Sequence, residues 1–251
     1  MDERIERAAR LVREAETVVA FTGAGVSTAS GIPDFRSDGG IWERYDPGDF
    51  HIRRFEADPD GFWRDRAELV ADVYDGYEPN AAHEALATLE REGELDRVVT
   101  QNIDGLHTRA GSESVVEIHG NGDRVVCRNC AQRYAAEPFY EAVRDGEIDG
   151  APRCADCDGL LKPDVVLFGE PLPTGPLEEA KRLSHEADCY LVVGSSLTVE
   201  PAASLPDRAA TTGADLVVLN LDETRVSDRA AVDLRANVTD SLPGIRSAAL
   251  D

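Results

Sequence analysis

A loop that ends at Arg36 carries a carboxylate, an aromatic ring and a cation on adjacent residues. It closes the segment TVVAFTGAGVSTASGIPDFR, residues 17–36. The segment opens with an apolar run that is typical of a buried parallel strand. A turn follows at Gly23-Ala24-Gly25, where backbone N–H groups can bind an anion such as a pyrophosphate. This combination predicts a nucleotide site with reactive groups beside it.

The glycine turn is not specific by itself. The dinucleotide fingerprint has a third glycine three residues after the second, and Thr28 occupies that position here. Glycine turns between a strand and a helix also occur without any ligand. From this turn alone, a nucleotide site and a plain turn remain equally open.

Four of the five cysteines form two pairs, Cys127-x-x-Cys130 and Cys154-x-x-Cys157. This spacing predicts a four-thiolate zinc site. Disulfides are disfavoured in a reducing compartment, and a redox function would need only one pair. Four thiolates leave no open position on the metal, so we expect the zinc to be structural. Cys189 lies in an apolar run and is interpreted as a small buried hydrophobic residue.

The composition limits the class of protein. The 251 residues carry a net charge of −23, with 49 Asp and Glu against 26 Lys and Arg. This charge could attract a basic partner. We favour a surface kept soluble at very high salt, as in salt-accumulating halophiles, where the screening length falls to about 3 Å. The charge argues against direct binding of nucleic acid, which needs a basic face.

No apolar run has the length of a signal peptide or a membrane span. We therefore expect a cytoplasmic protein that makes no contact with a membrane. The chain has no long terminal extension, which favours a monomer.

Short apolar runs alternate with helical stretches such as Ala81–Glu92 and Leu177–His185. This alternation predicts an α/β fold with a mostly parallel, doubly wound, Rossmann-like sheet. The expected strands are Val18–Phe21, Arg97–Thr100, Val115–Ile118, Val165–Phe168, Tyr190–Val193 and Leu216–Leu219.

Polar or glycine-containing clusters follow all six expected strands. Since ligands bind at the carboxyl ends of parallel strands, these clusters should lie on one edge of the sheet. This agreement strengthens the nucleotide interpretation. The clusters are Gly23–Gly25, Gln101–Asp104, His119-Gly120, Gly169-Glu170, Gly194–Ser196 and Asn220.

Two segments interrupt the α/β pattern. Residues 38–78 predict a loop plus helices, and residues 122–162 form the zinc module, which is too small to be stable without a metal. We expect both to pack as a smaller domain over the sheet edge, with the cofactor in the cleft between the domains. The Rossmann-like domain would comprise residues 1–37, 79–121 and 163–251.

Several ordered motifs resemble the sirtuins, NAD-dependent protein-lysine deacylases, here of prokaryotic or archaeal type. The resemblance covers nearly the whole chain. It implies an acyl transfer from lysine to the ribose of NAD, which gives nicotinamide, O-acyl-ADP-ribose and free lysine. The motifs are GAGVSTASGIPDFR (23–36), TQNIDGLH (100–107), HG (119–120), the four cysteines, KPDVVLFGE (162–170), GSSL (194–197) and Asn220-Leu221.

The resemblance also implies roles for single residues. His119 would be the general base that activates a ribose hydroxyl, a role that suits imidazole near neutral pH. Asn102 and Asp104 would bind the nicotinamide ribose and carboxamide, and Phe35 would shield the reactive carbon from water. The remaining implied cofactor contacts are Gly23, Ala24, Gly25, Ser27, Thr28, Asp34, Arg36, Trp42, Gln101, Ile103, Gly194, Ser195, Ser196, Asn220, Leu221, Asp222 and Val238. A simple strand-end turn remains the alternative for Ser195 and Ser196.

The segment KPDVVLFGE would bind the acyl-lysine. Val165, Val166 and Phe168 would line a tunnel for the lysine stem. Gly169 and Glu170 would pair with the substrate backbone as an added strand. An ordinary core strand is the alternative.

The acyl group is left open by the sequence. Sirtuins that prefer succinyl or malonyl lysine carry a Tyr and an Arg three residues apart, and the matching positions here are Trp63 and Arg66. Arg66 could pair with an acyl carboxylate, or it could be one more charge on a helix surface. We favour deacetylation because the Tyr is missing, and acidic or hydrophobic acyl groups remain open.

Three other functions remain. An ADP-ribosyltransferase on the same scaffold would share the release of nicotinamide. A non-enzymatic sensor of NAD or ADP-ribose would not need the general base. A dehydrogenase would be expected to have the third glycine.

Overall fold

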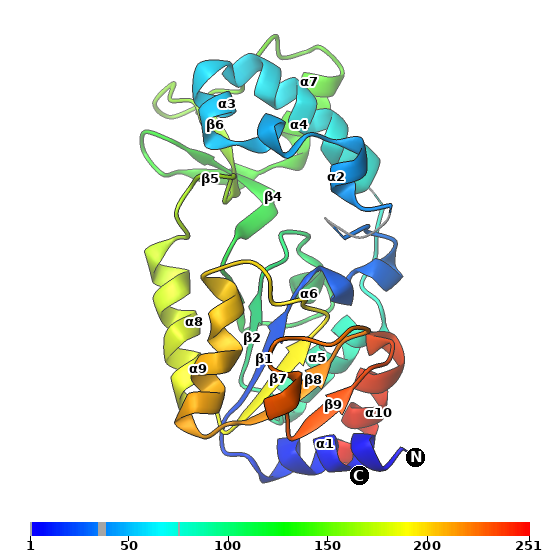
Figure 1. The fold of residues 1–251 in the computed structure, drawn as a ribbon. Coiled ribbons are helices and arrows are strands. Elements are labelled where there is room, and N and C mark those ends of the chain that lie inside the picture. The colour runs from blue at the N-terminus through cyan, green and yellow to red at the C-terminus, as the bar shows by residue number, and fades with distance from the viewer. Residues whose placement is uncertain (1, 35–38, 75) are drawn as a thin grey trace.

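The main body is a six-stranded parallel sheet in the order β3-β2-β1-β7-β8-β9. The computed structural model describes residues 2–34, 39–74 and 76–251, and Figure 1 shows the arrangement of its elements. The strand order reverses between β1 and β7, which is the switch point of a doubly wound, Rossmann-like fold. The strands are β1 (Val18–Thr22), β2 (Arg97–Thr100), β3 (Val115–Glu117), β7 (Cys189–Val193), β8 (Asp215–Leu219) and β9 (Val232–Leu234).

Helices cover both faces of this sheet (Figure 1). One core cluster packs α1 (Glu3–Glu14), α5 (Ala81–Glu92) and α10 (Val238–Leu250) on one face. A second packs α8 (Thr174–Glu186) and α9 (Leu205–Thr212) on the other. The sheet is therefore buried on both sides, which explains why its strands are nearly continuous apolar runs.

A smaller body lies beyond the carboxyl ends of these strands (Figure 1). Its antiparallel sheet has the order β5-β4-β6, and the third core cluster joins this sheet to the helices around it. Aromatic rings fill much of that core, with Phe55 and Phe62 packed edge to face. The elements are β4 (Gly120–Cys127), β5 (Arg133–Ala135), β6 (Leu161–Val165), α2 (Ile41–Arg44), α3 (Ile52–Ala57), α4 (Pro59–Val73) and α7 (Glu137–Arg144).

One predicted strand of the main sheet is wrong. The sequence indicated Val165–Phe168, whereas the strand is β6, Leu161–Val165, on an edge of the small sheet. Pro163 fits there because an edge strand does not need every backbone N–H. Gly169 and Glu170 therefore do not follow a strand of the parallel sheet. The predicted domain limits at 121 and 162 both fall inside strands, β4 and β6.

Strand β9 was not predicted from the sequence; it has three residues and pairs with β8 at the sheet edge. Such a short strand shows no periodicity. Cys189 is confirmed as a buried residue, with 1% exposure in β7. Within the described part of the chain, no helix has the length and apolar character needed to cross a membrane.

Candidate active site

Three loops meet at the switch point of the sheet. The first follows β1 and carries Ser27, and the second follows β2 and carries Asn102 and Asp104. The Asn102 side-chain amide donates to Gly23 O at 3.2 Å and to Ser27 Oγ at 3.1 Å. Ser27 Oγ in turn donates to Asp104 Oδ2 at 2.7 Å. The predicted clusters after β1 and β2 therefore form one hydrogen-bonded group.

The third loop follows β7 and joins the same group. Gln101 Nε2 donates to Ser195 Oγ at 2.8 Å. Ser195 is buried, whereas Ser196 is exposed and pairs with Thr198 Oγ1. The structure thus brings Gly194–Ser196 beside the loop after β2.

The glycines of the first turn have a local reason that differs from the expected one. A Cβ at Gly23 or at Gly25 would lie 2.8 Å from Gly194 O, closer than real Cβ contacts allow. Gly25 N also donates to Gly194 O at 2.8 Å. Both glycines therefore permit close packing of two loops, and they do not by themselves indicate the approach of a ligand.

His119 follows β3 and faces the loop after β2. Ile118 N donates to Thr100 O at 3.1 Å, which extends the strand pairing up to the histidine. His119 Nδ1 lies 3.0 Å from Gln101 O. Because a carbonyl can only accept, we assign the proton to Nδ1 and leave the lone pair on Nε2. Burial lowers the pKa of His119, with the Gln101 carbonyl opposing, so the ring is neutral at pH 7 and can accept a proton.

Asp104 lines a small pocket next to this histidine-bearing edge. Burial raises the pKa of its carboxyl group, and hydrogen bonds from the Leu106 N–H and the Ser27 hydroxyl oppose that shift. A polar carboxylate among apolar walls suits a ligand that carries an amide or a hydroxyl group. The pocket is lined by Ala24, Ser27, Ile32, Pro33, Tyr74, Asn102, Ile103 and Asp104.

A wider hollow of about 580 Å³ lies at the edge strand β3, lined by residues such as Ser112, Glu113 and Arg124. None of the predicted site residues lines it. We therefore place the candidate site at the switch point because the predicted polar residues gather there, although the hollow at β3 is wider.

Two buried histidines, His83 and His107, contact residues of β1 and of the loop that follows it. The His83 and His107 rings are edge to face, with centroids 4.9 Å apart. His107 Nε2 lies 2.9 Å from Thr22 Oγ1, and His83 Nε2 lies 3.4 Å from Ser27 Oγ. Burial lowers the pKa of His83 to about 4 and that of His107 well below its usual value. Both rings are neutral in the folded protein at pH 7.

These histidines predict a loss of stability in mild acid. The unfolded state takes up protons below pH 6.5, while the folded state does not until the pH approaches 4 for His83. The free energy of unfolding should therefore fall as the pH drops from 7 to 5, by about 2 kcal/mol for His83 alone. Chemical denaturation at the two pH values measures this.

The matched variants are His83→Gln, which removes the titrating ring, and His185→Ala, which changes an exposed histidine on α8. The first should weaken the pH dependence, and the second should leave it unchanged. An identical pH dependence in His83→Gln and the unchanged chain would contradict the assignment.

The four predicted metal ligands come together in the small body. All four sulfur atoms lie within 4.8 Å of one another. Cys127 Sγ is 3.5 Å from Cys157 Sγ, and Cys130 Sγ is 3.6 Å from Cys154 Sγ. A tetrahedral zinc site with Zn–S bonds of about 2.3 Å places its sulfurs about 3.8 Å apart. The cluster fits zinc, and its S–S distances are too long for disulfides.

Comparisons with known proteins agree with this geometry. A profile of the Sir2 family matches residues 23–201. An NAD-dependent protein deacetylase of Haloarcula marismortui is 56% identical, over 97% of this chain and 94% of that protein. The chain belongs to the Sir2 family.

Solved Sir2 structures share the whole fold. One, from work on the mechanism and regulation of Sir2 enzymes, has a TM-score of 0.86 at 41% identity, and the match covers 100% of this chain and 99% of the other. Another, a Sir2 complex with a deacetylated p53 peptide and 3′-O-acetyl ADP ribose, has a TM-score of 0.85 at 38% identity and 97% coverage of both chains. This confirms the sirtuin resemblance and the Rossmann-like fold with a smaller zinc-type module.

Other expected cofactor residues of this Sir2 chain lie one strand further along the sheet edge, where Gly194 N donates to Leu219 O at 2.9 Å. Asn220 follows β8, and its amide donates to Asp222 O at 2.9 Å. Leu221 is 69% exposed, and Val238 is buried at the start of α10. Phe35 and Arg36 lie outside the described residues. The expected cofactor contacts therefore run along the sheet edge from the loop after β2, through Gly194, to the loop after β8.

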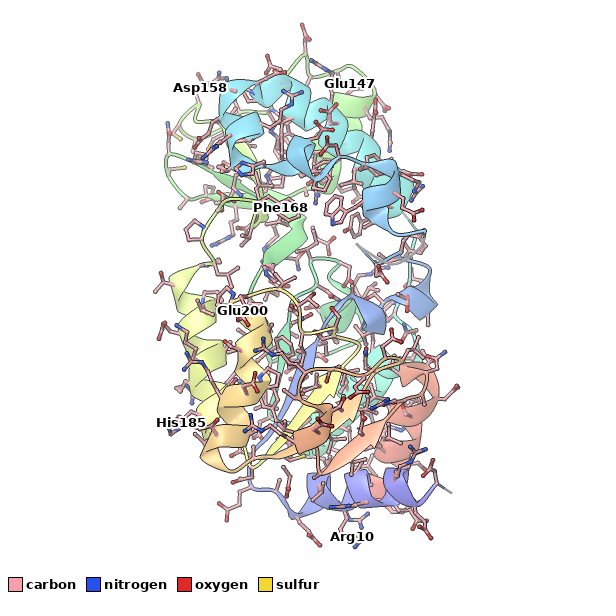
Figure 2. All side chains as sticks on the ribbon, viewed as in Figure 1. Arg10, Glu147, Asp158, Phe168, His185 and Glu200 are labelled. Carbon is pink, nitrogen blue, oxygen red and sulfur yellow. The ribbon has the colours of Figure 1, made fainter. Side chains whose placement is uncertain are left out.

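The expected substrate segment lies beside His119. Val166 N donates to His119 O at 2.8 Å. Figure 2 shows Phe168 between the two bodies. Its ring packs on the Trp42 ring, with the ring centroids 5.4 Å apart. Trp42 therefore neighbours the expected substrate segment. Val165 is buried in the core of the small body.

The expected acyl-selecting residues are both interior. Trp63 is fully buried, and its Nε1 donates to Leu161 O at 3.0 Å. Arg66 is only 5% exposed, so the alternative that it is a helix-surface charge is wrong. Its buried Nε has no hydrogen-bond partner in the described part of the chain. Arg66 lies close enough to Tyr74 to lower the pKa of that phenol, which burial nevertheless raises to about 12.

Sequence reasoning missed Tyr74, which lines the pocket beside Asp104. A tyrosine at the end of a helix carried no signal in the sequence. Ile32 and Pro33 also line the pocket; they lie inside the motif GIPDFR but were not singled out.

Proposed function

We propose that this protein is an NAD-dependent protein-lysine deacylase that yields free lysine, nicotinamide and O-acyl-ADP-ribose. The observation that carries the proposal is the His119 ring, whose Nδ1 lies on Gln101 O so that Nε2 keeps the lone pair, beside the group formed by Asn102 and Asp104. The Haloarcula relative is an NAD-dependent protein deacetylase, and one similar structure holds a deacetylated peptide with an acetylated ADP-ribose. Both support the same reaction here.

The chain's own residues divide the work. Bound NAD would supply an electrophilic ribose carbon with nicotinamide as its leaving group. Asn102 and Asp104 would hold the nicotinamide ribose and carboxamide, since they present an amide and a carboxylate at the pocket. His119 would take a proton from a ribose hydroxyl at Nε2, and Gln101 O would stabilise the resulting imidazolium at Nδ1.

The rest of the cofactor would lie along the switch point. The turn Gly23–Gly25 with Ser27 and Thr28, and the loop Gly194–Ser196, would border the phosphates and ribose. Asn220, Leu221, Asp222 and Val238 would hold the adenosine end. The loop of Asp34, Phe35 and Arg36, with Trp42, would cover the reactive carbon. The large exposed fraction of Leu221 suits a residue that a bound purine would cover.

Acidic acyl groups are a second candidate substrate class. The favouring observation is Arg66, a buried cation that neighbours Tyr74 in the pocket wall and whose Nε has no hydrogen-bond partner among the described residues. A carboxylate at the end of an acyl chain could pair with it. Against this stands Trp63, which is packed in the core and offers no hydroxyl group. We therefore keep acetyl-lysine as the first substrate.

The net charge and the cysteines support a cellular compartment and a salt range for this protein. The four clustered cysteines suit zinc thiolates and Cys189 is buried outside any disulfide, which fits a reducing cytoplasm. The net charge of −23 and the Haloarcula relative support function at high salt. We further propose a monomer that acts on peptides or proteins and binds no nucleic acid.

The decisive experiment identifies the products by mass spectrometry. The protein is incubated in high salt with NAD and paired acetyl- and succinyl-lysine peptides. We expect free lysine together with O-acyl-ADP-ribose, and faster turnover of the acetyl peptide. Faster turnover of the succinyl peptide would assign Arg66 to the acyl carboxylate. ADP-ribose attached to protein, with the acyl group left on lysine, would replace the proposal by a transferase.

A further inference from the structure

The segment 165–170 is built around a buried lysine. Lys162 is 7% exposed and is one of only two lysines in the chain. Its ammonium group donates to Val165 O at 2.6 Å and to Glu170 Oε2 at 2.9 Å. It therefore reaches both ends of the segment from inside the small body.

Glu170 closes the segment on itself. Its Oε2 atom accepts a second hydrogen bond, from Leu167 N at 2.8 Å. Glu170 N donates back to Leu167 O at 3.0 Å, which completes a tight turn with Gly169 at φ +82°. The carboxylate is thus occupied inside the turn.

Residues of neighbouring elements also hydrogen-bond to the backbone of residues 165–170. Phe168 N donates to Phe50 O at 3.2 Å, and Ile52 N donates to Phe168 O at 2.9 Å. The His51 ring lies against Gly169, where a Cβ would be 2.4 Å from the imidazole. On the other side, Val166 N donates to His119 O. Phe168 nevertheless keeps 40% of its side chain exposed.

A buried ion pair is not explained by stability alone. Burial lowers the pKa of Lys162, and the Glu170 carboxylate opposes that shift. Desolvating two charges commonly offsets their attraction, so net stability is a weak explanation for such a pair, and holding one conformation is the other role such pairs have. The conformation fixed here is that of residues 165–170.

We propose that the Lys162–Glu170 ion pair is a clamp that holds residues 165–170 in the conformation that binds the acyl-lysine peptide. Lys162 is then a positioning residue, which acts through the backbone at Val165 and through Glu170. The inference rests on the proposed function, because it assumes that this segment receives the substrate.

The test compares Lys162→Met with the matched control Lys181→Met, which removes the half-buried lysine on α8. Lys162→Met should raise the KM for an acetyl-lysine peptide at least ten-fold. The KM for NAD and kcat at saturating peptide should change less than two-fold, since the clamp touches neither the cofactor loops nor His119 Nε2. Glu170→Gln keeps hydrogen-bonding atoms without the charge, so its KM for the peptide should rise to an intermediate value.

Peptide binding is also measured directly, by fluorescence anisotropy of a labelled acetyl-lysine peptide. This readout does not need turnover, so it separates the clamp from the catalytic proposal. A wild-type chain that binds the peptide but releases no lysine would refute the proposed function alone. Wild-type affinity in Lys162→Met, or equal loss of peptide and NAD binding in that variant, would refute the clamp. If Lys162→Met fails to fold, Glu170→Gln decides by the same criteria.

Discussion

The His119→Ala variant is expected to lose deacylation by about 10²–10⁴-fold, the usual contribution of a general base. The geometry gives the reason. Gln101 O holds the proton on Nδ1, and burial lowers the pKa of the ring, so Nε2 is the acceptor at pH 7. Alanine removes that acceptor but leaves the loops after β1, β2 and β7 in place. NAD should therefore still bind, which isothermal titration calorimetry checks.

His119 also sets the acid limb of the rate. The pKa of His119 in the folded protein lies below the ordinary 6.5 of histidine. The rate of deacylation should therefore decline only when the pH falls below 6.5. The exposed His185 provides the control (Figure 2), and His185→Ala should keep both the rate and the acid limb. Normal turnover by His119→Ala would overturn the assignment of the base.

The sequence predicts the main sheet well because parallel strands that are buried on both faces consist of nearly continuous apolar residues. β1, β2, β7 and β8 were all expected within one residue of their ends. The run Val165–Phe168 had the same composition, yet its first residue ends an edge strand of the other sheet. Apolar composition signals burial, and burial does not say against which sheet. That choice depends on pairing with β4, which lies some forty residues away in the chain.

The site was predictable where one residue type does the work. Four cysteines in two pairs indicate a metal cluster without any knowledge of the fold, and the structure gathers their sulfurs. Tyr74 and Lys162 lack such a signal because their roles depend on what surrounds them. A buried lysine that binds Glu170 and a backbone carbonyl looks in the sequence like any other basic residue. For Gly23 and Gly25 the sequence correctly indicated a position that needs glycine. The structural reason is their close packing against Gly194.

The Cys127→Ala variant is expected to lose zinc and to unfold the small body. Cys127 is the last residue of β4, which pairs with both other strands of its sheet. Its sulfur is one of four ligands that no other group can replace in a filled tetrahedron. Structural zinc contributes about 10–16 kcal/mol in small zinc-binding peptides. That amount matches or exceeds the whole stability of a typical domain, so the remaining apolar contacts should not hold the module at room temperature.

Metal analysis and calorimetry together decide the matter. The wild-type chain should contain one zinc per molecule, and Cys127→Ala should contain almost none and melt at a lower temperature. Cys189→Ala is the control, because it removes a buried thiol from β7 in the main sheet, at a cost of about 1 kcal/mol and with full zinc content. An unchanged melting curve in Cys127→Ala, with no zinc in the wild type, would refute the metal site. Loss of peptide binding with retained NAD binding would show that the metal supports the substrate side of the site, because the parallel sheet that carries the cofactor loops has its own core.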